Sequence, residues 1–121
     1  GLVIMHTIGS HWYYNAHYTD EFRRFVPETK SRIVTANTSE EMINSYDNTV
    51  VFTDYFISCI INRLRDRKAL MIYLSDHGEA LGEKGLWLHA NTVDAAHNPA
   101  CIVWLSDAYR EAKPGMYERL L

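Results

Sequence analysis

The sequence contains no apolar run of about 18 to 20 residues, the length that a helix needs to cross a bilayer. Its first residues are apolar, but they lack the basic start and the small-residue cleavage site of a signal peptide. We therefore expect the chain itself to be soluble and to begin inside a fold rather than with a leader segment.

The sequence also has no excess of basic over acidic residues. The 121 residues include 12 basic and 15 acidic side chains, which gives a net charge of -3 when histidine is counted as neutral. A chain with this balance has no general attraction to nucleic acid or to an anionic membrane surface. We therefore expect no nucleic-acid partner, and any recognition of phosphate must be local.

Cysteine is scarce, because only Cys59 and Cys101 occur. Both lie among apolar residues, and free cysteine is often a small buried residue, so we expect two buried thiols. One possible pair does not identify the redox compartment. With 47% hydrophobic residues, the chain can build a core, and we expect a single domain over residues 1–121.

The most informative segment that is present is LMIYLSDHGE, residues 70–79. An apolar run typical of a buried strand stops at polar residues, as strands do when they deliver side chains to a site at their carboxyl ends. We interpret Asp76 and His77 as metal ligands, because carboxylate oxygen and imidazole nitrogen both bind zinc. Gly78 would allow a sharp turn beneath them. The alternative is that Asp76 caps a following helix and His77 is a surface residue.

Other segments predict the surrounding elements. We expect strands at residues 2–6 and 100–105, and a helix from Thr38 to Arg65 whose apolar stripe packs on a sheet. Thr38 and Glu41 have the spacing of a capping box. Residues 2–6, the helix and residues 70–74 would form a right-handed parallel unit, because they follow one another as strand, helix and strand. A further short helix is expected over residues 108–113, capped by Ser106 and Asp107.

Three motifs resemble a known family. Residues 76–89, DHGEALGEKGLWLH, resemble the Asp-His-Gly-Glu-Ser-Leu-Gly-Glu-Asn-Gly run, with its closing Leu-His, of the phosphoethanolamine transferases that modify lipid A, including the mobile colistin-resistance enzymes. Residues 6–11, HTIGSH, are similar to the family's His-x-x-Gly-(Asn/Ser)-His motif. Residues 46–49 and 52–54 are similar to its Tyr-Asp-Asn-(Ser/Thr) and (Tyr/Phe)-Thr-Asp signature.

These transferases belong to the sulfatase and alkaline phosphatase superfamily. The resemblance implies an α/β fold, here part of an alkaline-phosphatase-like three-layer sandwich with a mainly parallel sheet. It also implies zinc, or another divalent metal, bound partly by Asp76 and His77.

The same resemblance implies two catalytic histidines. His11 matches the family's histidine on the substrate and second-metal side of the site. His89 matches the histidine that contacts the transferred phosphoryl group or a second zinc; without the resemblance it would be interpreted as an exposed loop residue. His97 precedes the last strand, where superfamily members often have a histidine, and it is a weaker candidate than His89.

The family's threonine nucleophile and its amino-terminal acidic metal ligand have no counterpart in this sequence. We therefore expect a carboxyl-terminal fragment of the catalytic domain, inactive alone, with open sheet edges that favour self-association. The parent protein would move phosphoethanolamine from a phospholipid to a lipid or glycan of the cell envelope, at the periplasmic face of the inner membrane. The alternatives are a sulfatase or phosphodiester hydrolase of the same superfamily, or a non-catalytic sulfatase-like domain.

Overall fold

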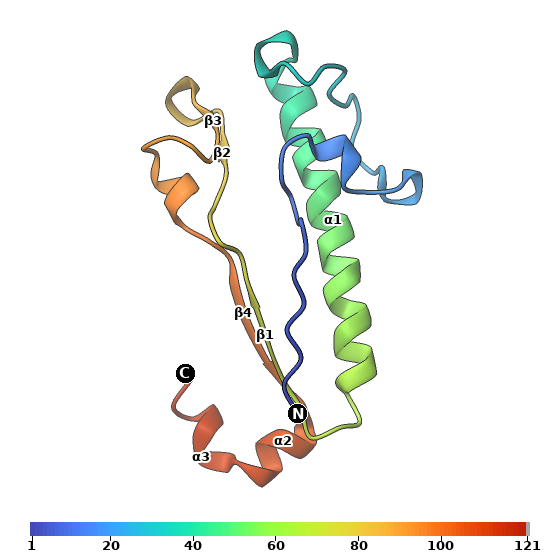
Figure 1. Cartoon of the computed structure of the whole chain (residues 1–121), viewed down its shortest axis with the longest axis vertical. Coiled ribbons are helices and arrows are strands. Elements are labelled where there is room, and N and C mark those ends of the chain that lie inside the picture. The colour runs from blue at the N-terminus through green and yellow to red at the C-terminus, as the bar shows by residue number, and fades with distance from the viewer. Residues whose placement is uncertain (121) are drawn as a thin grey trace.

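The computed structural model describes residues 1–120 as an α/β arrangement in which one long helix stands beside a narrow ribbon of strands (Figure 1). The helices are α1 (Ser39–Leu64), α2 (Asp107–Ala112) and α3 (Pro114–Tyr117). The strands are β1 (Leu70–Leu74), β2 (Ala80–Leu81), β3 (Trp87–Leu88) and β4 (Cys101–Leu105). Short 3-10 turns are η1 (Tyr14–Ala16), η2 (Asp20–Phe22), η3 (Val34–Ala36), η4 (Glu83–Gly85) and η5 (Asp94–His97).

Helix α1 begins and ends where the sequence predicts. The hydroxyl of Thr38 accepts the backbone N–H of Glu41 at 3.2 Å, and the Glu41 carboxylate accepts the backbone N–H of Thr38 at 2.8 Å. This exchange satisfies donors that have no partner inside the helix. The helix continues to Leu64, with Arg65 as its C-cap. The predicted helix and its capping box are therefore confirmed.

The buried side of α1 is more polar than the predicted apolar stripe. Ser45, Asn48 and Thr49 are buried there together with Met42 and Ile57. The main contacts of α1 are with η1, η2 and β2. The predicted packing of the stripe on a sheet is therefore limited to β2 in the described residues, because polar loops from the first 30 residues occupy much of the buried side of the helix.

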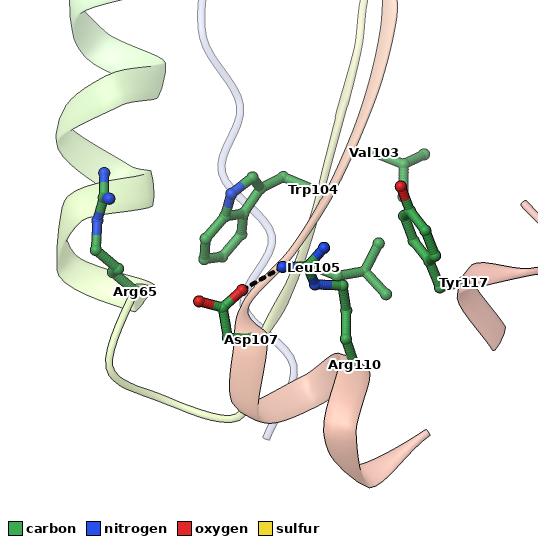
Figure 2. Close-up of a pocket in the computed structure, with 7 residues that line it drawn as sticks. All are labelled: Arg65, Val103, Trp104, Leu105, Asp107, Arg110 and Tyr117. Carbon is green, nitrogen blue, oxygen red and sulfur yellow. Dashed lines mark hydrogen bonds and ion pairs between the residues drawn. The ribbon is translucent and has the colours of Figure 1, made fainter. Parts of the chain in front are cut away.

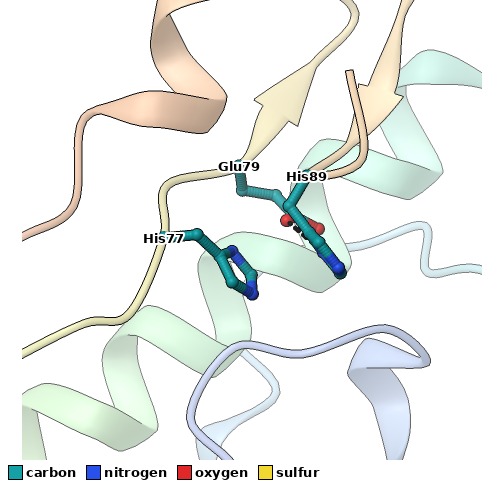
Figure 3. Close-up of side chains that lie close together, drawn as sticks. All are labelled: His77, Glu79 and His89. Atoms are coloured by element: carbon teal, nitrogen blue, oxygen red, sulfur yellow. Dashed lines mark ion pairs between the residues drawn. The ribbon is translucent and has the colours of Figure 1, made fainter. Parts of the chain in front are cut away.

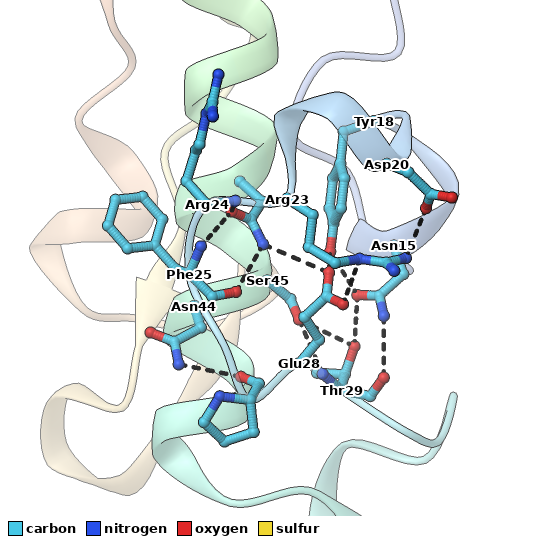
Figure 4. Close-up of polar contacts among 12 residues, drawn as sticks. Asn15, Tyr18, Asp20, Arg23, Arg24, Phe25, Glu28, Thr29, Asn44 and Ser45 are labelled. Carbon is cyan, nitrogen blue, oxygen red and sulfur yellow. Dashed lines mark hydrogen bonds and ion pairs between the residues drawn. The ribbon is translucent and has the colours of Figure 1, made fainter.

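Hydrogen bonds hold the loop after η2 against α1 (Figure 4). The side chain of Asn48 accepts the backbone N–H groups of Arg24 and Phe25 at 2.8 and 2.9 Å, and donates to the carbonyl of Phe25 at 3.0 Å. The hydroxyl of Ser45 accepts the backbone N–H of Thr29 at 2.8 Å. Buried polar groups are stable only when they are paired in this way. The irregular segment before α1 is thus fixed to the helix by specific contacts.

Strands β1 and β4 form an antiparallel ribbon, in which Leu70 lies opposite Leu105 and Leu74 lies opposite Cys101. Both strands agree with those predicted. The predicted parallel unit of residues 2–6, α1 and residues 70–74 is wrong for residues 1–120, where both two-stranded sheets are antiparallel. The chain reverses through the β2–β3 hairpin between β1 and β4, so β4 returns alongside β1 in the opposite direction.

Residues 1–8 run between α1 and the ribbon in Figure 1 without entering a strand. Leu2 and Ile4 are each 85% exposed, and His6 is exposed too. A strand is stabilised by a hydrogen-bonded neighbour and by a covered apolar face. The described chain gives this segment neither, and the predicted strand at residues 2–6 is therefore wrong.

Burial of the two thiols differs from the prediction. Cys59 is half-buried, whereas Cys101 is exposed, and the two are not joined. Cys101 opens β4, and a two-stranded ribbon has no further layer to cover that position. Within residues 1–120, no helix combines the length and the apolar character that crossing a membrane requires.

The predicted helix over residues 108–113 is confirmed as α2. The hydroxyl of Ser106 accepts the backbone N–H groups of Tyr109 and Ala69, each at 3.1 Å, so this cap also ties α2 to the start of β1. A hollow of about 320 Å³ lies beside it (Figure 2). Its lining residues are Arg65, Val103, Trp104, Leu105, Asp107, Arg110 and Tyr117. The hollow lies at the end of the ribbon opposite β2 and β3, and none of the predicted site residues lines it.

Candidate metal centre

The segment after β1 is held tightly by its neighbours. Gly78 donates its backbone N–H to the carbonyl of Ala96 at 3.0 Å. A Cβ atom at position 78 would lie 1.9 Å from the carbonyl oxygen of Ala95, so this close approach requires glycine. Ala80, Val93 and Ala96 form a small buried core directly beside it. The backbone that carries His77 and Glu79 is therefore packed against residues 93–96.

The β2–β3 hairpin brings a distant histidine back to this segment. Ala80 lies opposite Leu88 in the antiparallel register, and one further step along the register puts Glu79 opposite His89. Leu88 adopts a left-handed backbone conformation with φ of 67°, which is unusual for a residue with a branched side chain and redirects the chain at His89. Hairpin geometry therefore explains why residues ten positions apart meet.

His77, Glu79 and His89 converge (Figure 3). Each offers one nitrogen or oxygen atom, and these atoms all lie within 4.8 Å of one another. The rings of His77 and His89 stack with centroids 3.9 Å apart, and Glu79 Oε2 lies 3.6 Å from His89 Nδ1. The Glu79 side chain is only 5% exposed, whereas those of His77 and His89 are 33% and 35% exposed. The group thus has a buried carboxylate and two imidazoles that solvent reaches.

His11 joins this group from the loop before η1. Its ring centroid lies 5.7 Å from that of His89 and 6.5 Å from that of His17. Partial burial, with His11 and Arg32 nearby, lowers the pKa of His17. The structure therefore brings together His11, His77 and His89, three of the site residues that the sequence predicts.

Asp76, the fourth predicted residue, lies at the edge of this group. Its Oδ1 atom is 3.7 Å from His77 Nε2, and its side chain is 90% exposed. It does not cap a helix, because the chain continues from it into β2. His97 is exposed and uses its Nε2 to donate to the carbonyl of Asn91 at 3.0 Å, outside the group.

Glu79 is a member of the group that sequence reasoning did not single out. Strand alternation gave no signal for it, because His77 and Glu79 lie in the segment between β1 and β2, and the approach of Glu79 to His89 depends on the register of β2 and β3. A hydroxyl holds this carboxylate in place: Tyr14, fully buried in η1, donates a hydrogen bond to Glu79 Oε1. Burial and this carboxylate raise the pKa of Tyr14 well above its ordinary value, so its hydroxyl stays protonated.

The donor set fits a zinc ion. Imidazole nitrogen and carboxylate oxygen are ordinary zinc ligands, at about 2.0 to 2.2 Å from the metal, and catalytic zinc sites combine about three of them. The ligand atoms lie within 4.8 Å of one another, and the stacked rings of His77 and His89 would have to rotate to point at one ion. Two histidines and one carboxylate are thus a donor set of the kind that zinc uses.

Comparisons with known proteins place the chain in a family. The sulfatase family model matches residues 1–119. Phosphoethanolamine transferase EptA of Escherichia coli K12 is 39% identical over 121 residues, which cover 92% of this chain and 22% of the relative. The chain therefore spans about a fifth of the length of that relative.

Two solved structures are similar to this chain in both sequence and fold. The soluble domain of lipooligosaccharide phosphoethanolamine transferase A from Neisseria meningitidis is 38% identical with a TM-score of 0.78, covering 88% of this chain and 34% of that one. The C-terminal periplasmic domain of phosphoethanolamine transferase EptC from Campylobacter jejuni is also 38% identical, with a TM-score of 0.74, covering 82% and 35%. Because the family model matches nearly all of its length, this chain belongs to the sulfatase family.

Proposed function

We propose that this chain supplies part of the active site of a metal-dependent phosphoethanolamine transferase. The observation that carries the proposal is the convergence of His77, Glu79 and His89, with His11 beside them. The similarity to EptA and to the two transferase domains supports the reaction class. The nucleophile and the remaining metal ligands would come from the rest of the parent domain, so the chain alone would not turn over substrate.

We assign metal binding to Asp76 and His77, with Glu79 and His89 in reach of the same ion. Zinc or another divalent metal would polarise a phosphoryl oxygen and stabilise the negative charge that develops there. Glu79 would contribute a carboxylate oxygen from a side chain that is only 5% exposed. Asp76 approaches from the solvent side, next to His77.

His11 and His89 would act on the phosphoryl group. Imidazole can donate a hydrogen bond or move a proton near neutral pH, which suits a group that orients a phosphoryl oxygen or protonates a leaving alkoxide. His89 lies between His77 and His11, in contact with both rings. It would therefore connect the metal ligands with the substrate side of the site.

For the parent protein we propose the family reaction. Phosphoethanolamine would pass from a phospholipid donor to a lipid or glycan acceptor of the cell envelope, at the periplasmic face of the inner membrane. The two similar domains, one of a lipooligosaccharide phosphoethanolamine transferase and one the periplasmic domain of a phosphoethanolamine transferase, support these assignments. The complete catalytic domain would be a three-layer sandwich with a mainly parallel sheet, completed by segments beyond the described ribbon.

Calorimetric titration of the chain with zinc tests the metal part of the proposal. We expect one ion per chain, with binding at least about tenfold weaker in His77→Ala and in Asp76→Ala. His97→Ala is the matched control, because His97 is exposed and bonded elsewhere, and its affinity should equal that of the unmodified chain. Equal losses in all three variants would contradict a site at His77.

Binding of phosphoethanolamine, compared with binding of an aryl sulfate, tests the substrate class. Phosphoethanolamine titrated into the zinc-loaded chain should shift its ³¹P resonance, and His11→Ala should remove the shift. Preferential binding of an aryl sulfate at the same site would favour the sulfatase alternative, and binding of neither compound would favour a non-catalytic domain.

A further inference from the structure

We propose that Tyr14 is a positioning residue for the metal centre: its hydroxyl holds one oxygen of Glu79 so that the other oxygen faces the histidines. This inference rests on the proposed metal-binding function and adds a residue outside the ligand set. Two observations carry it: the hydrogen bond to Glu79 and the fixed position of the Tyr14 ring.

The Glu79 carboxylate divides its two oxygens between two partners. Oε1 accepts the hydroxyl of Tyr14, and Oε2 lies 3.6 Å from His89 Nδ1. The Glu79 side chain is 5% exposed and Tyr14 is fully buried, so water does not take the place of either partner. A charge-assisted hydrogen bond of this kind is stronger and more directional than one between neutral groups. Tyr14 therefore selects the orientation of the carboxylate.

The Tyr14 ring is itself held in place. Tyr46 of α1 contacts it edge to face with ring centroids 5.5 Å apart, and Trp12 contacts it edge to face at 5.0 Å. Edge-to-face contacts fix the direction of an aromatic ring. The Trp12 indole is anchored in turn, because Nε1 donates to the carbonyl of Arg32 at 3.2 Å. The hydroxyl consequently reaches Glu79 from a fixed base.

The same contact connects two parts of the site. Tyr14 is the first residue of η1, three positions after His11, while Glu79 stands directly before β2. A bond from Tyr14 to Glu79 ties the loop that carries His11 to the hairpin that carries His89. This explains how two exposed segments far apart in sequence keep the His11 and His89 rings 5.7 Å apart. Tyr14 would thus align the proposed metal ligands and the proposed phosphoryl-contacting histidine together.

Tyr14→Phe tests the role, because it removes the hydroxyl and keeps the ring contacts. Tyr13→Phe is the matched control: it removes a hydroxyl from the adjacent residue, one that donates to the carbonyl of Thr29 at 3.0 Å and does not contact Glu79. Zinc affinity is measured by competition with a chromophoric chelator, and near-ultraviolet circular dichroism checks that both variants are folded. We expect about tenfold or greater weakening in Tyr14→Phe, the range for partners of metal ligands, and less than about twofold in Tyr13→Phe.

A double variant separates positioning from a general structural effect. In a Glu79→Gln background the carboxylate that Tyr14 orients is gone, so adding Tyr14→Phe should weaken zinc binding no further. Equal zinc affinity in Tyr14→Phe and Tyr13→Phe would overturn the positioning role and leave the proposed function intact.

A chain that bound no zinc would instead remove the proposed metal function. In that case the hydrogen bond between Tyr14 and Glu79 is tested in the metal-free chain, by measuring the ring ¹⁵N resonances of His89. Tyr14→Phe should shift these resonances and Tyr13→Phe should not; unchanged resonances in both variants would overturn the inference.

Discussion

Glu79 and His89 face each other at the open end of the β2–β3 hairpin, with 3.6 Å between Glu79 Oε2 and His89 Nδ1. The pairing depends on backbone register, because Ala80 and Leu88 are partners one step further into the hairpin. Carboxylate oxygen and imidazole nitrogen are both ordinary zinc ligands, so this pair is the core of the proposed metal centre. This relationship organises the candidate site.

Glu79→Gln should weaken zinc binding by at least about tenfold, because the amide keeps the shape of the side chain and removes the negative charge. Calorimetric titration measures the change. Glu111→Gln is the control, since Glu111 is exposed on α2, far from the group. A Glu79→Gln chain with unchanged affinity would mean that Glu79 is not a ligand and that the metal is held by the histidines with Asp76.

Gly78→Ala should lower the free energy of unfolding by about 1 to 3 kcal/mol, the usual cost of forcing an extra methyl group into a packed position. The added Cβ would lie 1.9 Å from the carbonyl oxygen of Ala95, so the loop that carries His77 must shift. Urea unfolding followed by circular dichroism measures the loss, and zinc affinity should fall with it. Gly115→Ala should show no such loss, because no described atom lies within 4 Å of a Cβ atom there.

Local signals in the sequence predict the isolated elements well. The capping box of Thr38 and Glu41 marks the start of α1, and Ser106 marks the start of α2, because caps depend only on residues a few positions away. The apolar runs likewise identify β1 and β4. The predicted parallel pairing differs from the antiparallel pairing of β1 with β4, because pairing direction depends on how the hairpin between the two strands turns the chain back.

The sequence predicts only those residues of the candidate site that lie in local motifs. Sequence motifs indicate His11, His77 and His89, and the structure brings their rings together. Glu79 requires the register of β2 and β3, which two-residue strands do not reveal in sequence. Tyr14 and Glu79 lie 65 positions apart in the sequence, and no local pattern predicts the hydrogen bond between them.

Asn48→Ala should destabilise the chain strongly. The buried Asn48 side chain accepts the backbone N–H groups of Arg24 and Phe25 in part-buried hydrogen bonds, and the net loss of a hydrogen bond costs about 0.5 to 1.5 kcal/mol. Asn44→Ala is the control on the same helix, because the Asn44 side chain makes one exposed hydrogen bond, to the carbonyl of Pro27 at 3.0 Å. Urea unfolding curves should separate the two variants clearly; equal midpoints would contradict a structural role for Asn48.

The stability of the chain should fall on acidification through a contribution from His17. Partial burial and the neighbouring His11 and Arg32 lower the pKa of His17 below its ordinary value, so the unfolded chain binds a proton more readily than the folded chain. The contribution is present above the ordinary imidazole pKa of about 6.5 and is lost as the pH falls toward the lowered value. His17→Gln should flatten the dependence of the melting temperature on pH in this window. A slope identical to that of the unmodified chain would contradict the assignment.

The ribbon should make the chain self-associate. Ile72 and Leu74 of β1 are 61% and 65% exposed, and they lie on one face because they are two residues apart along a strand. An exposed apolar strand face favours pairing with another copy. Sedimentation velocity should therefore detect oligomers that the double substitution Ile72→Lys and Leu74→Lys reduces. Ile33→Lys, which removes an isolated apolar side chain that is 66% exposed near η3, should leave association unchanged; an equal effect of both changes would indicate nonspecific aggregation rather than pairing through β1.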